Sequence, residues 1–374
     1  MQPGLYEATT GTIEGGRSPR DQLRVQHDRQ KPRASIHNLV ARHRSSFFES
    51  FFFLQTIQSE SRARLPGLFI QPQRSHNRGT CRSPELPWIA GRNLVPTSVV
   101  ADKNYLEHPS LELFLREDAG NKVLLHDFSA IESLAGNPLK NLCRTLSIVS
   151  KFPDQVLILK NSRTLLAMGA IRPEFRFEMV DWPQTRSFGE YCEDVQKAEA
   201  GDELRRAAVA AHARDASEHL AKMLTIVPLM TDLIGRLAAT TDPGVIVARR
   251  KGDIAMPGEG GAKLIHEAFD IASAIAERGN APRVPLEIDE AAQHYVLRFA
   301  VALRLFALRW AEAGSDVRDA RPELLRNDFV DLIYITCATY WDDFLTSEKK
   351  MAHIYSETSF LVNDLLSRKR LEAR

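Results

Sequence analysis

The chain has 374 residues, of which 44% are hydrophobic and 26% are charged. This composition supports a globular core and excludes a wholly disordered chain. The net charge of +1 conceals an uneven distribution, because residues 1–93 contain 13 Arg and one Lys against seven Asp or Glu. They therefore carry +7 and residues 94–374 carry −6, so we expect the two parts to differ in structure.

The first part, residues 1–93, shows little periodicity and is rich in Arg, Gln, Ser, Pro and His. This composition predicts a poorly ordered tail without a packed core of its own. Two alternatives stay open: an Arg-rich arm that binds nucleic acid, and a stretch that is not native coding sequence.

The polar N-terminus and the spacing of the cysteines indicate the cellular compartment of the protein. The first 30 residues are polar, so we expect no signal peptide, and the aromatic run FFESFFFLQ at 47–55 is too short to span a bilayer. The four cysteines lie at 81, 143, 192 and 337 without a CxxC pair, which fits neither a zinc site nor a disulfide scaffold. We therefore expect a cytoplasmic protein without a membrane partner.

Strands and helices alternate from about residue 94. Residues 98–101 form a short apolar strand, and a helix follows with Pro109 near its first position. A second strand at 123–125 precedes the helix FSAIESLAG, which Gly136 ends. A third strand is expected at 156–159. This alternation predicts parallel βαβ units and an α/β fold.

A long helical insertion is predicted at about 186–315, with loops at TTDPGV (240–245) and KGDIAMPGEGG (251–261). The helix NDFVDLIYITCATYWDD and a short strand, FLTS, follow it. We expect 94–165 and 325–360 to share one mainly parallel sheet. Residues 94–374 would then be one domain that contains the insertion.

Four acidic residues stand at informative places. Asp102 ends the first strand, and Glu132 lies in the first two turns of the helix after the second strand. Asp331 lies near the start of the last predicted helix, and Glu348 follows the last strand. Carboxyl ends of parallel strands and amino ends of the following helices share one edge of a sheet. The four side chains should therefore meet, across up to 246 residues of chain.

Clustered carboxylates would support metal chemistry. They repel one another and raise one another's pKa, and a cation relieves that repulsion. Carboxylate oxygens suit Mg²⁺ or Mn²⁺, and two such ions can activate a water in phosphodiester cleavage. Singly, each acid also has a structural explanation as a cap, a helix-dipole partner or a surface charge. Together they predict a metal site.

These motifs resemble those of PIN-domain nucleases. VVADKNYL resembles the family's opening strand, with an Asp followed two residues later by Asn or Ser, and VLLHDFSAIESL resembles its second strand. NDFVDLIYITCATYWDDFLTSEKKM resembles the segment with an Asp, a helix, a strand and Thr-x-Asp before a basic residue, except that Glu348 replaces the last Asp. The resemblance covers 94–165 and 325–360 and implies a Rossmann-like, three-layer parallel sheet.

The resemblance also implies an activity. It implies a metal-dependent endonuclease that cuts single-stranded RNA rather than DNA, with one or two Mg²⁺ or Mn²⁺ ions held by Asp102, Glu132, Asp331 and Glu348. The possible partners are a second copy of the chain and an antitoxin-like protein. RNA turnover, a toxin and a defence system all stay open as biological settings.

Supporting residues follow from the same motifs. Asn104 and Thr346 would orient carboxylates or waters. Asp328 lies three residues before Asp331 on the same helix face and could share its role, or it could be an N-cap. Asp342 and Asp343 are interpreted as a turn.

Two other classes of protein compete with a nuclease. A non-catalytic PIN-like scaffold would bind nucleic acid or protein. A phosphatase of the haloacid-dehalogenase type would need Asp-x-Asp at the first strand, whereas this chain has Asp102-Lys103-Asn104. The first strand is followed by neither a GxGxxG nor a Walker-type loop, which disfavours binding of dinucleotides or nucleoside triphosphates.

Overall fold

A computed structural model describes residues 96–251, 259–279 and 281–372. The predictions for residues 1–93, and most of the predicted loop at 251–261, lie outside these residues. Within the described ranges, four strands form one parallel sheet in the order β3-β2-β1-β4. They are β1 (Ser98–Ala101), β2 (Lys122–Leu125), β3 (Val156–Ile158) and β4 (Asp343–Leu345).

The register of the sheet joins distant parts of the chain. Val99 pairs with Val123 of β2 on one side and with Asp343 of β4 on the other. The prediction that 94–165 and 325–360 share a parallel sheet is therefore confirmed. All four residues of β1 are buried, as expected for the apolar central strand of a parallel sheet.

Short helices connect the first three strands and follow β3. They are η2 (Tyr105–Glu107), α4 (Pro109–Glu117), α5 (Asp127–Ser133), α6 (Pro138–Leu146), η3 (Val149–Lys151), η4 (Pro153–Gln155), α7 (Ser162–Met168), η5 (Pro173–Met179) and α8 (Trp182–Arg186). Local sequence sets their starts. Pro109 and Pro138 each occupy the first helical position, where a missing N–H costs nothing. The side chain of Asn137 caps α6 by accepting a hydrogen bond from the Lys140 N–H.

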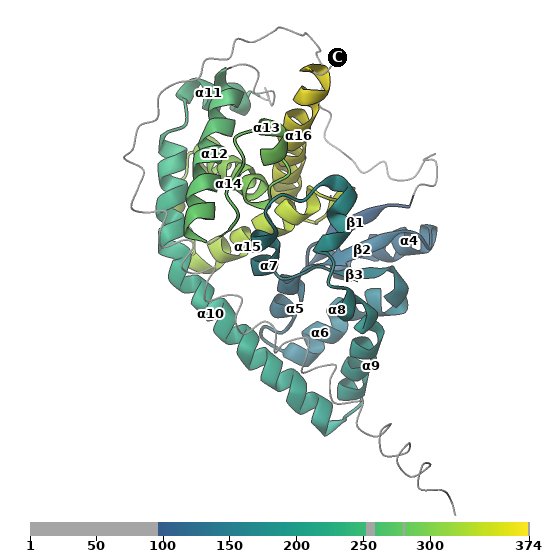
Figure 1. The fold of residues 1–374 in the computed structure, drawn as a ribbon. Helices are drawn as coiled ribbons and strands as arrows, with labels where there is room; N and C mark the ends of the chain where they lie inside the picture. Colours follow the sequence, from purple (N-terminus) through teal and green to yellow (C-terminus); the bar gives the residue numbers. More distant parts are fainter. Residues whose placement is uncertain (1–95, 252–258, 280, 373–374) are drawn as a thin grey trace, which may run out of the picture.

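Longer helices make up most of the rest. They are α9 (Phe188–Glu199), α10 (Glu203–Ala239), α11 (Pro243–Arg250), α12 (Glu259–Arg278), α13 (Ile288–Ala291), α14 (Tyr295–Ala313), η6 (Val317–Asp319), α15 (Pro322–Ala338) and α16 (Lys349–Glu372). α10 packs against α14 and α15 and also against α5, α6 and α9. Figure 1 shows it running along one side of the molecule, past both of these groups. The described chain is thus mostly helical with a small parallel sheet, which is compatible with the predicted α/β class.

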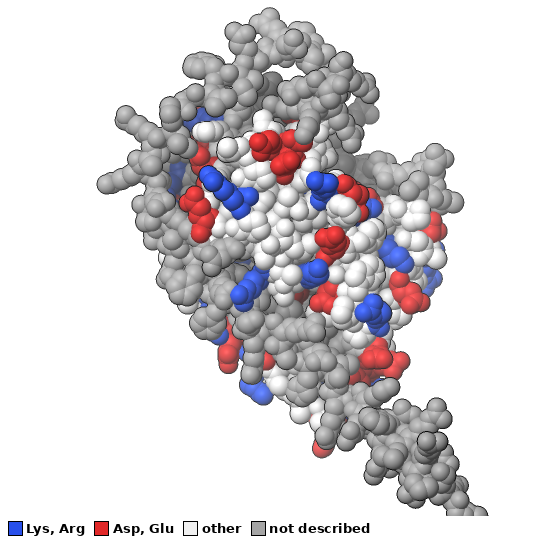
Figure 2. All heavy atoms as spheres, in the orientation of Figure 1, with Lys and Arg blue, Asp and Glu red and all other residues white. Residues whose placement is uncertain are grey.

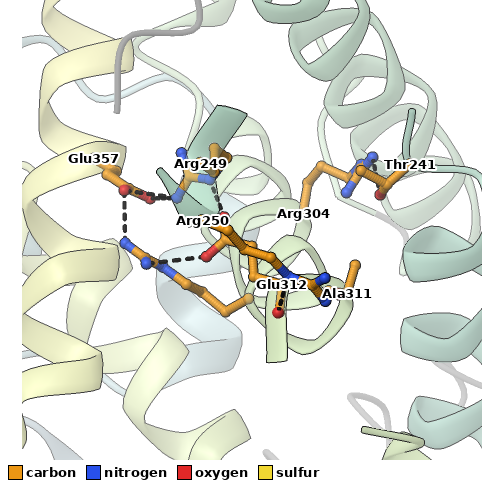
Figure 3. A network of polar contacts seen from close by, with 8 residues as sticks. Thr241, Arg249, Arg250, Arg304, Ala311, Glu312 and Glu357 are labelled. Carbon is orange, nitrogen blue, oxygen red and sulfur yellow. Dashed lines mark hydrogen bonds and ion pairs between the residues drawn. The ribbon is translucent and has the colours of Figure 1, made fainter. Parts of the chain in front are cut away.

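A closed polar network ties three of these helices together (Figure 3). Arg249 of α11 pairs with Glu312 of α14 and lies 2.8 Å from Glu357 of α16. Arg309 of α14 lies 3.1 Å from Glu312 and 2.7 Å from Glu357. Only 4% of the Arg249 side chain is exposed. Because each cation has two anionic partners, the network offsets the cost of burying the charges.

Three predicted element boundaries were wrong. The helix that carries Asp331 begins at Pro322, five residues before the predicted start, so Asp331 lies in its middle and Asp328 is not an N-cap. Asp343 is the first residue of β4 rather than part of a turn. Half of the predicted loop at 240–245 is helix, because the Asp242 side chain caps α11 by accepting from Gly244 N–H.

Among the described residues, no single helix is both long and apolar enough to cross a bilayer. Helices α10 and α11, bent by 89° where they meet, satisfy the length and composition criteria only as a pair.

Candidate functional site

Asp102 and Glu348 follow neighbouring strands of the sheet. Ala101 of β1 pairs with Leu345 of β4, and the Asp102 N–H donates to the Leu345 carbonyl at 3.0 Å. The parallel register therefore delivers both acids to the same edge of the sheet. Asp102 is buried, with 3% of its surface exposed, whereas Glu348 is exposed.

Thr346 connects these two residues. Its hydroxyl accepts a hydrogen bond from the Glu348 N–H at 3.0 Å, and it acts to lower the pKa of the Asp102 carboxyl. Asp102 Oδ1 also accepts from the Tyr105 N–H at 2.6 Å. Asn104 contributes its backbone N–H to Asp102, while its side chain is exposed. The side chain that orients Asp102 is thus that of Thr346, and Asn104 acts through its backbone.

Glu132 and Asp331 come from two helices, α5 and α15. Glu132 lies in the second turn of α5, as predicted. Its Oε2 lies 3.3 Å from the phenol oxygen of Tyr334, which is one helical turn beyond Asp331 on α15. Both carboxylates are largely buried. The Tyr334 contact therefore places Glu132 beside the part of α15 that carries Asp331.

The pKa of Asp331 depends on its burial and on the charges of the other three acids. Burial raises its pKa well above the usual range, and the negative charges of Glu348, Glu132 and Asp102 raise it further. The charges of all three other predicted site residues thus act on Asp331. These residues lie up to 229 residues away in the chain. The structure therefore places the other three acids within electrostatic range of Asp331.

Two other carboxyl groups of the cluster also hold their protons more tightly than usual. Burial raises the pKa of Glu132 to about 7, with a further increase from Asp102, and the hydrogen bond from Tyr334 opposes it. Burial likewise raises the pKa of Asp102, where Glu348 adds to the effect and the Thr346 hydroxyl opposes it. Crowding and burial act in the same direction, so a cation would be stabilised among these groups.

Asp328 differs from the other acids. Only 2% of it is exposed, and one of its carboxylate oxygens pairs with Lys350 of α16. Burial raises its pKa, and the Lys350 ammonium opposes that effect. Lys350 also lies 5.4 Å from the centre of the Phe306 ring. Lys350 neutralises Asp328 on one side, and the charge of Asp328 also acts on Asp331. The shared role with Asp331 stays a prediction.

The cluster suits a divalent cation by the chemistry of its donor atoms but not by their present arrangement. Within the described ranges, no three His, Cys, Asp or Glu side chains already form a coordinating arrangement. Asp102 instead faces Thr346 and the Tyr105 N–H, and Glu132 faces Tyr334. The backbone brings the carboxylates together, and a cation would draw them away from these donors. The donor set, all carboxylate oxygen and mutually repelling, fits Mg²⁺ or Mn²⁺.

Positive charge lies next to the cluster. Lys103 and Arg326 both act to lower the pKa of Glu132, and Lys103 also pairs with Glu107 at 3.1 Å. On the face drawn in Figure 2, basic residues are interspersed with acidic ones and the described residues form no continuous basic surface. Sequence reasoning missed Arg326 and Tyr334. The spacing of Tyr334, three residues after Asp331, was the available signal for the latter.

Comparison with known proteins assigns the chain to no family. It matches no protein-family model, no curated protein and no solved structure. The resemblance to PIN-domain nucleases therefore stays an interpretation of the motifs and of the order in which the carboxylates occur. Any function has to be argued from the carboxylate cluster itself.

Proposed function

We propose that the chain is a metal-dependent endonuclease with a Rossmann-like, PIN-like fold that hydrolyses phosphodiester bonds in single-stranded RNA. The observation that carries this proposal is geometric: the strand register brings Asp102 and Glu348 to one edge of the sheet, and the Tyr334 contact places Glu132 beside the helix of Asp331. The charges of the other three acids raise the pKa of Asp331, in agreement with this arrangement. These acids come from separate elements, and they follow the chain order of the PIN motifs at the carboxyl edge of a parallel sheet.

In this proposal the acidic residues bind the cation and the neighbouring basic residues bind the substrate. Asp102, Glu132, Asp331 and Glu348 would hold one or two Mg²⁺ or Mn²⁺ ions. When bound, such an ion lowers the pKa of a water molecule and offsets the charge that develops on the phosphate. Thr346 orients Asp102. Because four carboxylates repel a phosphate backbone, the positive charges of Lys103 and Arg326 beside Glu132 would help to hold the substrate.

A non-catalytic PIN-like scaffold that binds nucleic acid or a protein partner is the second candidate. It is favoured by the finding that, in the described part of the chain, no three potential ligands already form a coordinating arrangement. Glu348 in place of the family's Asp points the same way. The two functions differ in one measurable property, since only the nuclease requires a divalent cation.

The test is the substitution Asp102→Asn, which keeps the shape of the side chain and removes its charge. Cleavage of a single-stranded RNA in Mn²⁺ should fall about 100-fold or more, while the variant remains folded. Asp154→Asn is the matched control, because Asp154 is exposed and lies two residues before β3, at the opposite edge of the sheet. Unaltered protein that cleaves neither RNA nor DNA with any divalent cation, and melts identically with and without one, would favour the scaffold.

A further inference from the structure

Tyr334 joins the two helices that contribute buried acids to the cluster. The residue is fully buried on α15. Its phenol oxygen lies 3.0 Å from Ser129 Oγ and 3.3 Å from Glu132 Oε2, and both of these partners belong to α5. Asp331 lies three residues earlier on α15, which is the same side of a helix.

The chemistry of the three groups fixes the direction of these hydrogen bonds. When it is ionised, the Glu132 carboxylate only accepts, so the phenol donates its hydrogen to Glu132. The phenol oxygen then accepts from the Ser129 hydroxyl. The resulting chain runs from Ser129 through Tyr334 to Glu132, and each member has its partner within 3.3 Å.

Packing restricts the Tyr334 ring. The ring of His126 meets it edge-on, with the centres 5.6 Å apart and the planes at 64°. His126 is itself stacked on Phe128 at 5.6 Å. The phenol is therefore held by packing on its ring and by Ser129 on its oxygen. A donor held in this way can keep a flexible glutamate in one direction.

Glu132 has other partners available to it. The positive charges of Lys103 and Arg326 act on it, and Lys103 pairs on its other side with Glu107 at 3.1 Å. Lys103 follows β1, and a Glu132 side chain that turned toward it would move away from α15, the helix that carries Asp331. The Tyr334 phenol pulls the carboxylate toward α15 instead, where Asp331 lies.

We propose that Tyr334 is a positioning residue that holds the Glu132 carboxylate beside Asp331, so that both can bind the same divalent cation. The inference rests on the proposed function, because it assigns Glu132 to the cation. The resemblance assigns no role to Tyr334. In this inference α15 contributes both Asp331 and the tyrosine that positions Glu132.

The test uses the full chain with Mn²⁺ as the probe. Free Mn²⁺ is followed by electron paramagnetic resonance for the unaltered protein, Tyr334→Phe, Glu132→Gln and the double variant. Tyr334→Phe removes only the hydroxyl and should weaken Mn²⁺ binding about 10-fold. In the Glu132→Gln background it should have no further effect, because the phenol would have no carboxylate to aim. For RNA cleavage, kcat should fall while KM stays unchanged.

The control is Tyr295→Phe, which removes the hydroxyl of another buried tyrosine, whose oxygen lies 3.8 Å from Cys337 Sγ. It should leave Mn²⁺ binding unchanged. If Tyr334→Phe does not fold, Ser129→Ala replaces it and should weaken binding about threefold in the same direction, since it frees the phenol.

The possible results distinguish a failure of the positioning role of Tyr334 from a failure of the proposed metal centre. Unchanged Mn²⁺ affinity in Tyr334→Phe, or in Ser129→Ala where that variant replaces it, would overturn the positioning role and leave the proposed nuclease intact. An equal loss with and without the Glu132 carboxylate would also overturn it. If the unaltered protein binds no Mn²⁺, the metal centre of the proposed function falls, and the positioning role falls with it.

Discussion

The Glu132 carboxylate allows a quantitative test of what the acidic cluster does to folding. Burial, reinforced by Asp102 and opposed by Tyr334, raises its pKa from 4.5 to about 7. A carboxyl with a higher pKa in the folded state binds its proton more tightly there than in the unfolded chain. Its stabilising contribution is therefore complete below about pH 4.5 and is lost as the pH rises through about 7.

The size of this loss follows from the two pKa values. Each tenfold change in proton affinity is worth about 1.4 kcal/mol, so the change from 4.5 to about 7 corresponds to about 3 kcal/mol. Glu132→Gln removes the ionisation, and the amide oxygen can still accept from Tyr334. Without divalent cations, this variant should be about 3 kcal/mol more stable than the unaltered protein at pH 8. The two should be nearly equal at pH 4.5.

Urea unfolding in the presence of a chelator, repeated from pH 4.5 to 8, measures this difference directly. Glu193→Gln is the control, because its side chain is 69% exposed on α9 and lies 3.5 Å from Lys197. Its stability should change with pH as that of the unaltered protein does. If the curves for Glu132→Gln and the unaltered protein run parallel across this range, Glu132 is not crowded as described.

Two further predictions concern the helical part. Glu357→Gln should lower the free energy of unfolding by about 3 kcal/mol, because the buried Arg249 keeps its charge and loses one of its two anions. A loss below about 1 kcal/mol, measured by urea unfolding, would contradict a stabilising role for this polar network. Gly169→Ala should lower the free energy of unfolding by about 1–3 kcal/mol in the same assay, because Gly169 has φ +70° and a Cβ would lie 2.9 Å from Pro282. The control is Gly189→Ala, in a helix and with the nearest atom to a Cβ at 3.7 Å, which should not destabilise the protein.

The strands could be predicted because they are short apolar runs that end at polar residues. The structure places β1 at Ser98–Ala101, the residues predicted. Helix starts were harder to place. Pro322 begins α15 with Glu323 in its first turn and Leu325 buried, a start signal that lies before the motif beginning at Asn327. At 240–245, Asp242 and Pro243 are a cap and a first helical residue rather than a turn.

The site could be predicted as far as strand order determines it. Asp102 and Glu348 meet because β1 and β4 are neighbours, a pairing that strand-end positions alone suggest. The partners of the acids could not be predicted. Whether Lys350 pairs with Asp328, or Tyr334 with Glu132, depends on how helices rotate against one another. Side chains 202 residues apart reveal this only once they are packed.

The helical insertion takes part in building the site. Asp331 and Tyr334 reach the cluster only if α15 keeps its rotation, and α15 packs against α10 and α14, which both belong to the insertion. Phe329 of α15 meets Phe299 of α14 edge-on, with ring centres 5.4 Å apart. Turning α15 by one residue, about 100°, would move Asp331 away from Glu132 while leaving β1 and β4 paired. The sheet thus determines where Asp102 and Glu348 lie, and the insertion determines whether Asp331 joins them.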